Sequence, residues 1–399
     1  MCCGKRGEQS FVRSRAPYWC RHTKLEGEGM KLRRDALLAL AVAAAVIVGT
    51  IGPNVARADN PRAVKVLTYN IYQGSELEHA LSAATLPQFI AGVGTDYQNV
   101  VDTNFVERAD ALATEIAQEK PALVGLQEVA TWKTQIPFGS GPTAVSYDFL
   151  QILLDALAAH GLSYRSVIAR DNFVAPAGGG FAPGFDPALY PFGLIGVQLT
   201  ERSAILARTD LPTDELQLSN PQEGAYQHIS QLPTLTGPFP FGAGWLSVDA
   251  KVRGKTFRFI TSHLDGFNTA VNTAQADEVL AGPAATDLPV VWVGDFNSQV
   301  TDPTYSVVTG AGFADEWDVA HPGDAGLTCC QVPPDSIVNP VSQLHSRIDY
   351  VFARGLFAPS DIHVIGDQPS SRTPSGLWPS DHAGLTSTLT IGPQADLTP

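Results

Sequence analysis

The chain has 399 residues, a formal net charge of −14 and a hydrophobic content of 44%. This length and apolar content suffice for one large core, and no stretch after residue 58 has the composition of a linker or a repeat. The acidic charge argues against a tight, metal-free electrostatic grip on nucleic acid, because such a surface repels phosphate. It does not exclude a nuclease, since metal ions can bridge an acidic site and a phosphate.

The first 58 residues have the organisation of an exported precursor. Residues 1–29 are basic without apolar periodicity, so we interpret them as a non-native or disordered extension before a true start at Met30. Residues 31–34 are basic, residues 36–51 are uncharged, and Ala56-Arg57-Ala58 offers a small-x-small cleavage site. This pattern predicts a signal peptide over 30–58. The apolar run is shorter than the roughly 20 residues of a membrane span, so a retained anchor is the less favoured alternative.

Removal of the signal peptide makes the expected mature protein more acidic. Residues 1–58 carry 10 basic and 4 acidic residues, so 16 basic and 36 acidic residues remain, formally −20. We expect a catalytic domain over 59–393 and a short tail over 394–399. The mature protein is expected to be a monomer that is secreted or periplasmic.

Strands and helices alternate along the mature chain. The first strand is expected at 63–71, and amphipathic spacing predicts a helix over 105–120 that Pro121 ends. A second helix is expected over 147–159, with helical patterns again near 273–280 and 304–309. Alternation of this kind indicates an α/β fold, and the turn at 253–255 adds an antiparallel hairpin. The other expected strands are 122–126, 164–169, 203–207, 245–252, 256–262, 289–293, 348–352 and 385–389.

Six short strings place polar residues at or near the ends of apolar runs. Any one of them could recur by chance, but their fixed order resembles the endonuclease/exonuclease/phosphatase superfamily, the metal-dependent phosphoesterases of deoxyribonuclease and sphingomyelinase type. The resemblance covers roughly residues 64–389. The strings are Thr68-Tyr69-Asn70, Leu126-Gln127-Glu128-Val129, Thr261-Ser262-His263-Leu264, Gly294-Asp295-Phe296-Asn297, Arg347-Ile348-Asp349-Tyr350 and Ser380-Asp381-His382.

The resemblance implies a fold and a reaction. The fold is a two-sheet β-sandwich flanked by helices, a four-layer α/β/β/α arrangement like that of deoxyribonuclease. Its active site lies at one edge of the sandwich, where strand ends converge. The reaction is hydrolysis of a phosphoester with Mg²⁺ or Mn²⁺ as the cofactor.

Glu128 has the features of a magnesium ligand. A buried strand delivers this carboxylate, and Mg²⁺ prefers hard oxygen ligands. The alternative is an ordinary Glu at a turn. Asn70, at the end of the first strand, can orient a metal-bound water or contact phosphate, and the resemblance places Asp381 near the metal. The expected metal set is therefore Glu128, Asn70 and Asp381.

Asp295 and Asn297 form the most specific of the six strings. Residues two apart on a strand end face the same side, so the carboxylate can hold the attacking water while the amide contacts a phosphoryl oxygen. Asn297 and Asn70 are thus the expected substrate-binding residues. The alternative for this string is a simple Asp-x-Asn turn.

Two histidines are expected to take part in catalysis. His382 follows Asp381, and Asp349 is the expected carboxylate that orients its ring, which is the logic of a general-base dyad. For His263 the resemblance is to the pancreatic deoxyribonuclease branch, whose equivalent histidine pairs with a Glu that precedes an apolar strand ending in Arg. Glu201 and the strand that follows it match that pattern, so His263–Glu201 is the expected second dyad.

Two further features leave alternatives open. Cys329 and Cys330 are adjacent, without the spacing of a zinc site, and either close a vicinal disulfide in an oxidising compartment or stay a free pair. Residues 173–190 are rich in Gly, Pro and aromatics. The aromatic side chains either cover the protein's own core or make a peripheral contact with a membrane surface. The substrate is a phosphoester of unresolved class: a nucleic acid, a phospholipid head group or a soluble phosphate.

Overall fold

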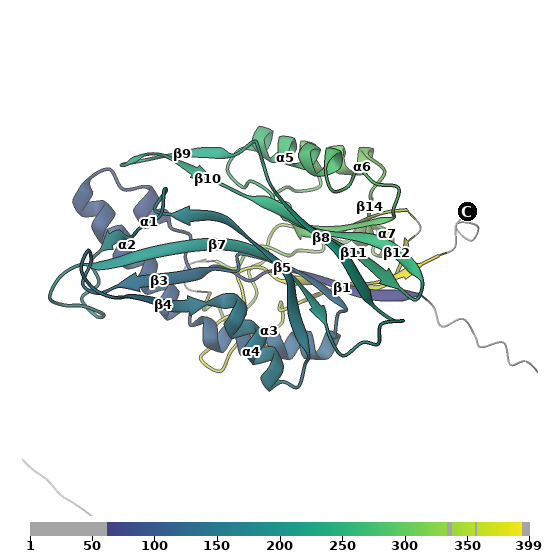
Figure 1. Cartoon of the computed structure of the whole chain (residues 1–399), viewed down its shortest axis with the longest axis horizontal. Coiled ribbons are helices and arrows are strands. Elements are labelled where there is room, and N and C mark those ends of the chain that lie inside the picture. The colour runs from purple at the N-terminus through teal and green to yellow at the C-terminus, as the bar shows by residue number, and fades with distance from the viewer. Residues whose placement is uncertain (1–61, 333–336, 356, 393–399) are drawn as a thin grey trace, which may run out of the picture. The chain divides into compact units, whose positions relative to one another are not determined.

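A computed structural model describes residues 62–332, 337–355 and 357–392, all within one compact unit (Figure 1). The expected extension over 1–29, the signal peptide over 30–58 and the tail over 394–399 lie outside the described residues. Within the described part of the chain, no helix is long and apolar enough to cross a membrane.

The larger sheet has nine strands and holds the first two polar strings. Its strands follow the order β16-β17-β1-β2-β7-β3-β4, and β5 and β6 also pair with the long strand β7. The strands are β1 (Ala63–Asn70), β2 (Leu123–Gln127), β3 (Thr131–Gln135), β4 (Thr143–Asp148), β5 (Tyr164–Ala175), β6 (Ala182–Gly184), β7 (Ile195–Arg208), β16 (Phe357–Ile365) and β17 (Gly384–Ile391).

The smaller sheet has six strands in the order β14-β15-β13-β12-β11-β8. The expected turn at 253–255 joins β11 to β12 as an antiparallel hairpin. A separate two-stranded ribbon, β9 (Ser230–Thr234) with β10 (Gly237–Phe241), lies outside both sheets. The strands of the smaller sheet are β8 (Gln217–Ala225), β11 (Gly244–Val252), β12 (Lys255–His263), β13 (Val290–Asp295), β14 (Ala314–Asp315) and β15 (Asp349–Arg354).

Helices cover the outer faces of the two packed sheets, which gives the four-layer α/β/β/α sandwich that the resemblance implies (Figure 1). Helices α2 (Leu86–Asp102), α3 (Phe105–Glu119) and α4 (Phe149–Ala159) pack on the larger sheet, and α5 (Thr269–Ala281) and α6 (Pro303–Gly310) pack on the smaller one. The inner faces meet in an apolar core that includes Val66, Leu123, Val248, Phe259 and Val293. Short helices are α1 (Glu78–Leu81), α7 (Glu316–Ala320) and the 3₁₀ turn η1 (Pro369–Ser371).

Helix α2 was not expected from the sequence. Gly92 and Gly94 weaken its helical signal, because glycine is a poor helix former. The structure explains both glycines by close packing. A Cβ at Gly92 would lie 2.3 Å from the carbonyl oxygen of His79, and one at Gly94 would lie 2.0 Å from that of Phe185. The glycines therefore let α1 and the β6–β7 loop approach the helix backbone.

Candidate active site

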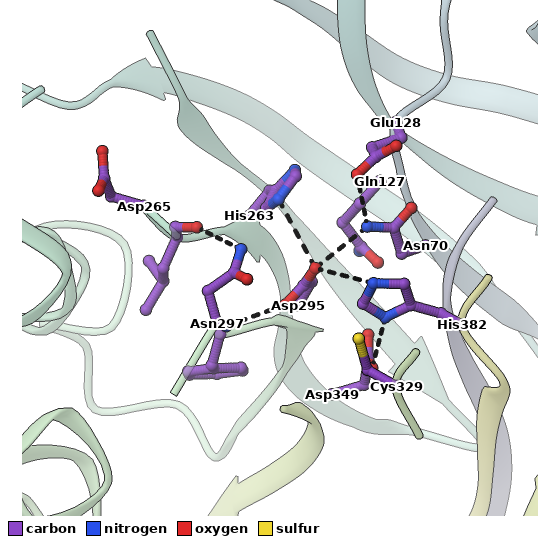
Figure 2. A network of polar contacts seen from close by, with 12 residues as sticks. Asn70, Gln127, Glu128, His263, Asp265, Asp295, Asn297, Cys329, Asp349 and His382 are labelled. Atoms are coloured by element: carbon purple, nitrogen blue, oxygen red, sulfur yellow. Dashed lines mark hydrogen bonds and ion pairs between the residues drawn. The ribbon is translucent and has the colours of Figure 1, made fainter. Parts of the chain in front are cut away.

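The polar ends of four central strands meet at one edge of the sandwich (Figure 2). The parallel pair β1–β2 brings Asn70 beside Gln127, and the parallel pair β12–β13 brings His263 beside Asp295. Asp349 opposes Asp295 across the antiparallel pair β13–β15. A cavity of about 210 Å³ opens there, and six of the expected site residues line it: Glu128, His263, Asp295, Asn297, Asp381 and His382.

Asp295 lies at the centre of the polar network and is 1% exposed. Its Oδ2 accepts a hydrogen bond from Asn70 Nδ2 at 3.1 Å, and it lies 3.6 Å from His263 Nε2 and 3.7 Å from His382 Nε2. Its Oδ1 accepts the backbone N–H of Asn297 at 2.9 Å. One buried carboxylate is thus shared by an amide and two imidazoles, which fixes it in the cavity wall.

The ring of His382 lies between two carboxylates. Nδ1 donates to Asp349 Oδ2 at 2.8 Å, so that Nε2 is turned toward Asp295. Burial alone would lower the pKa of His382, but the negative charges of Asp349, Asp381 and Asp295 raise it well above its ordinary value. The ring is therefore held by one carboxylate with its Nε2 turned toward the cavity, which is the orientation that a general base requires.

His263 has a looser carboxylate neighbour in Glu201. The Oε1 of Glu201 accepts the backbone N–H of Glu128 at 3.1 Å and lies 3.9 Å from His263 Nδ1, an ion-pair distance longer than a hydrogen bond. Burial would lower the pKa of His263, but Glu201 and Asp295 raise it to about 9. The ring therefore favours its protonated form and can donate to an anionic oxygen.

Asn70 joins Glu128 to Asp295. Its Nδ2 donates to Glu128 Oε1 at 2.9 Å as well as to Asp295, and its Oδ1 accepts the backbone N–H of Tyr72 at 3.0 Å. The other oxygen of Glu128, Oε2, accepts the backbone N–H of Gln73 at 2.8 Å. The amide nitrogen of Asn70, rather than its oxygen, thus faces the carboxylates, which suits a donor; oxygen ligation by Asn70 stays a prediction.

Asn297 combines the two alternatives that its string allowed. Its backbone N–H bonds to the Asp295 side chain in a turn, and its φ of 47° is left-handed. At the same time the side chain lies on the cavity wall, where Nδ2 donates to the Leu264 carbonyl at 2.9 Å. The turn is therefore the device that presents the amide to the cavity, and contact with a phosphoryl oxygen stays a prediction.

Comparison with known families decides what kind of protein this is. A family model described as the Endonuclease/Exonuclease/phosphatase family matches residues 67–382. The chain belongs to this family. Members are phosphoester hydrolases and generally depend on a divalent metal.

Solved structures of the endonuclease/exonuclease/phosphatase family share the fold. A family protein from Bacteroides thetaiotaomicron has a TM-score of 0.53 at 18% identity, over 85% of this chain and 99% of its own. A mannosyl-6-phosphatase of the same organism has 0.51 at 17% identity, over 82% and 99%. A family protein from Bacteroides vulgatus has 0.50 at 15% identity, over 83% and 99%. Identities this low establish the fold alone. No curated protein matches the sequence.

The donor set of the cavity fits the family's divalent metal. Glu128, Asp381 and Asp295 bring three carboxylates to it. Burial, together with the negative charge of Glu128, raises the pKa of Asp381 to about 6. A bound cation would reduce the electrostatic repulsion between these two carboxylates. Mg²⁺ takes such oxygen donors. A second group, Asp295, Asp349 and His382, has its ligand atoms within 4.8 Å of one another, but there His382 Nδ1 already bonds to Asp349.

Two buried polar residues hold together the segments around the candidate active site, although the sequence suggested no role for them. Gln127 joins the sheets behind the cavity, since its Nε2 donates to Thr261 Oγ1 at 2.9 Å. Arg108 is fully buried and donates to four backbone carbonyls. A signal for Arg108 was present, because it is a charged residue on the apolar stripe of α3, between Phe105 and Leu112.

Cys329 and Cys330 lie on the wall of the same cavity. The structure joins them as a disulfide, the first of the two alternatives left open by the sequence. Cys330 Sγ lies 4.0 Å from His382 Nε2, so the pair borders the expected general base.

Proposed function

We propose that the protein is a secreted phosphodiesterase, dependent on Mg²⁺ or Mn²⁺, that hydrolyses its substrate by in-line attack of an activated water. The observation that carries this proposal is the sharing of Asp295 Oδ2 between His382 and His263, at 3.7 and 3.6 Å. Each imidazole has a second carboxylate on its other nitrogen, Asp349 or Glu201. Two such pairs supply a proton acceptor and a proton donor at one site.

In the proposed reaction, each polar group has a defined task. His382 takes a proton from a water that Asp295 helps to place, and Asp349 fixes the tautomer and stabilises the imidazolium. His263 and Asn297 counter the negative charge that develops on the non-bridging oxygens. This division of tasks explains why one ring is bonded tightly to its carboxylate and the other is left to donate.

The metal, held by the carboxylates of Glu128 and Asp381 beside Asn70, would neutralise phosphate charge and polarise the phosphorus–oxygen bond when bound. An expected mature chain with 16 basic and 36 acidic residues has few cations of its own for that purpose. Export as a monomer is part of the proposal. N-terminal sequencing of the protein exported by a bacterial host should give Asp59 as the first residue.

The test uses purified residues 59–399 and bis(p-nitrophenyl) phosphate, with Mg²⁺, Mn²⁺ or EDTA. Hydrolysis should require the metal and should fall by roughly 10²–10⁴-fold in His382→Ala and in Asp295→Ala. His160→Ala is the matched control, because His160 caps α4 and pairs with Asp110 at the surface. Its rate should equal that of the wild type.

Near-wild-type hydrolysis by either site variant would refute the assigned roles. Hydrolysis of p-nitrophenyl phosphate in preference to the diester would instead favour the alternative, a soluble phosphomonoesterase of inositol-phosphate type. If metal and substrate give no turnover although the variants fold, the protein is a non-catalytic relative.

A further inference from the structure

A second, larger cavity lies beside the candidate active site. It has a volume of about 320 Å³, within the range of small-molecule sites. Helices α1 and α2, strands β3 and β7, the loop after β5 and the ribbon β9–β10 form its walls. Most of its lining is apolar, including Leu81, Phe89, Trp132, Leu199 and Phe239.

The polar wall of this cavity is internally satisfied. Asp96 is 2% exposed and accepts hydrogen bonds from His79 Nδ1 and from the backbone N–H of Ala80, both at 2.9 Å. Trp132 Nε1 donates to the Gln73 carbonyl at 2.9 Å. The cavity therefore offers an occupant apolar surface and little unpaired polarity.

Four segments around the cavity carry almost no charge. Residues 80–95, 134–147, 172–200 and 229–248 contain one charged side chain, Asp186, whereas 17% of the whole chain is charged. Glu78, Asp96 and Lys133 lie on the same walls, just outside these four segments. Asp186 is itself 3% exposed and accepts the backbone N–H groups of Ala188 and Leu189. The low charge of these four segments suits an uncharged, apolar occupant better than a phosphate backbone.

Large apolar side chains are exposed on these same four segments. Phe192 is 88% exposed, whereas Phe173, at the end of β5, packs in the core. Within the aromatic-rich stretch over 173–190, Phe173 is therefore buried and Phe185 is 47% exposed, and contact of this stretch with a membrane stays a prediction. Helix α1 contacts β9, α2 contacts β6, and Figure 1 shows β9 and β10 at the end of the molecule that holds α1 and α2. The exposed set is Leu86, Phe138, Val145, Phe185, Leu189, Phe192 and Leu235.

Adjacent residues of the chain line the apolar cavity and the catalytic cavity. Glu76 lines the catalytic cavity and its neighbour Leu77 lines the apolar one. The loop between β1 and α1 is tied to both, since Gln73 accepts from Trp132 and donates to Glu128.

A row of aromatic rings makes a second connection. Phe239, in the cavity wall, is 5.7 Å from Phe173, which is 4.6 Å from Phe241, which is 4.7 Å from Phe267, all between ring centroids. Phe267 is 55% exposed, and it shares a small polar hollow with Asn297. A row of packed aromatic rings thus joins the catalytic edge to the wall of the cavity.

We propose that this cavity binds the alkyl or acyl chain of an amphiphilic phosphoester, so that the substrate of the neighbouring site is lipid-like rather than a nucleic acid. The inference that the lipid-like molecule is hydrolysed as a phosphoester rests on the proposed function. The inference that the cavity binds an alkyl or acyl chain does not depend on it. Burial of each methylene favours binding by roughly three- to fourfold, so affinity grows with chain length until the cavity is full. The exposed aromatics around it are suited to the surface of a lipid aggregate.

The first experiment measures binding without catalysis. In EDTA, the wild type should bind the neutral fluorophore N-phenyl-1-naphthylamine saturably, and decanol should displace it. Ala177→Trp and Thr236→Trp each fill the cavity from an exposed lining position, and they should bind the probe at least ten times more weakly. Ala281→Trp, exposed at the end of α5, is the control and should bind as the wild type does. Unsaturable binding, or equal binding by all variants, would overturn the proposal.

The second experiment measures turnover of alkyl p-nitrophenyl phosphates from methyl to decyl, with Mg²⁺. KM should fall with chain length in the wild type and in Ala281→Trp, but stay flat in Ala177→Trp, while all three hydrolyse the methyl ester at the same rate. A flat wild-type KM would overturn this inference alone. No hydrolysis of any ester would instead refute the proposed function and leave the binding result standing.

A third comparison identifies whether the alkyl or acyl chain enters from solution or from a membrane. Short-chain phosphatidylcholine below its micelle concentration and long-chain phosphatidylcholine vesicles offer the same head group from solution and from a membrane. Faster hydrolysis of either supports the proposal and names the source. Cleavage of plasmid DNA without hydrolysis of either lipid would overturn it.

Discussion

His382 owes its chemical character to the carboxylate behind it. Asp349 accepts its Nδ1 proton at 2.8 Å, and that carboxylate is the leading cause of the raised pKa of His382. Replacement Asp349→Asn keeps the shape but removes the charge. We expect kcat/KM to fall by roughly 10²–10⁴-fold, because the ring loses its tautomer and the stabilisation of its imidazolium. The acidic limb of the pH–rate profile should move to lower pH, since the imidazole then protonates less readily.

The pH profile separates a chemical role from a structural one. A loss of activity with an unmoved acidic limb would contradict the role of Asp349, because mere loosening of the site does not change the affinity of the ring for a proton. Asp110→Asn is a suitable control, since Asp110 pairs with His160 at the surface.

Single residues were predictable where chemistry and strand ends coincide. Asn70, Glu128 and Asp295 meet at one site because each follows an apolar strand, and parallel neighbours end at the same edge. His382 reaches that edge differently, because it precedes β17, whose start lies beside the end of β1. Side-chain orientation was not predictable in this way. That Asn70 presents its nitrogen follows from the backbone N–H of Tyr72, which occupies its oxygen, and this contact depends on the local turn.

At the scale of elements, Arg108 of α3 ties together the segments that carry the site. Its guanidinium donates to the carbonyls of Thr103, Ile71, Tyr72 and Pro379 at 2.7–3.0 Å. Ile71 and Tyr72 follow Asn70 at the end of β1, and Pro379 shortly precedes Asp381 and His382. A single buried side chain therefore sets the spacing between the two halves of the expected metal site.

Arg108→Met should lower the free energy of unfolding by about 3–5 kcal/mol, because four buried carbonyls lose their donors. Urea unfolding measures this. Activity should fall further than stability explains, since both loops of the expected metal site are released. Arg208→Met is the control, because Arg208 forms a surface pair with Asp210 and its loss should cost less than about 1 kcal/mol. Equal effects of the two substitutions would contradict a positioning role for Arg108.

Helices and strands were predicted correctly where one hydrophobic periodicity, helical or alternating, dominated the segment. The helices expected over 105–120, 273–280 and 304–309 are present as α3, α5 and α6, and the expected hairpin joins β11 and β12. The strand expected over 203–207 was underestimated in length. β7 starts at Ile195, well before the expected 203, because its N-terminal half pairs with β3 and β6. Such pairing is a tertiary effect that no local window contains.

At the scale of the whole molecule, acidic charge and burial set how stability depends on pH. Glu115 of α3 is 6% exposed and accepts a hydrogen bond from the Tyr69 hydroxyl of β1 at 3.2 Å. Burial raises the pKa of Glu115 to about 8. Glu119, one turn further along α3, behaves oppositely. Burial alone would raise the pKa of Glu119, but Lys65 and His363 lower it.

The pH dependence of unfolding follows from the raised pKa of Glu115. Between about pH 4.5 and 8 the native state keeps a proton that the unfolded chain has lost, so stability falls as the pH rises through this window. Glu115→Gln keeps an acceptor for Tyr69 without the buried charge. It should therefore gain up to roughly 5 kcal/mol at pH 9 and little at pH 4.5. Glu119→Gln should lose stability at neutral pH, because it gives up its ion pairs. Thermal unfolding at several pH values measures both, and a Glu115→Gln variant less stable than the wild type at pH 9 would show that the ionised carboxylate is a stabilising group.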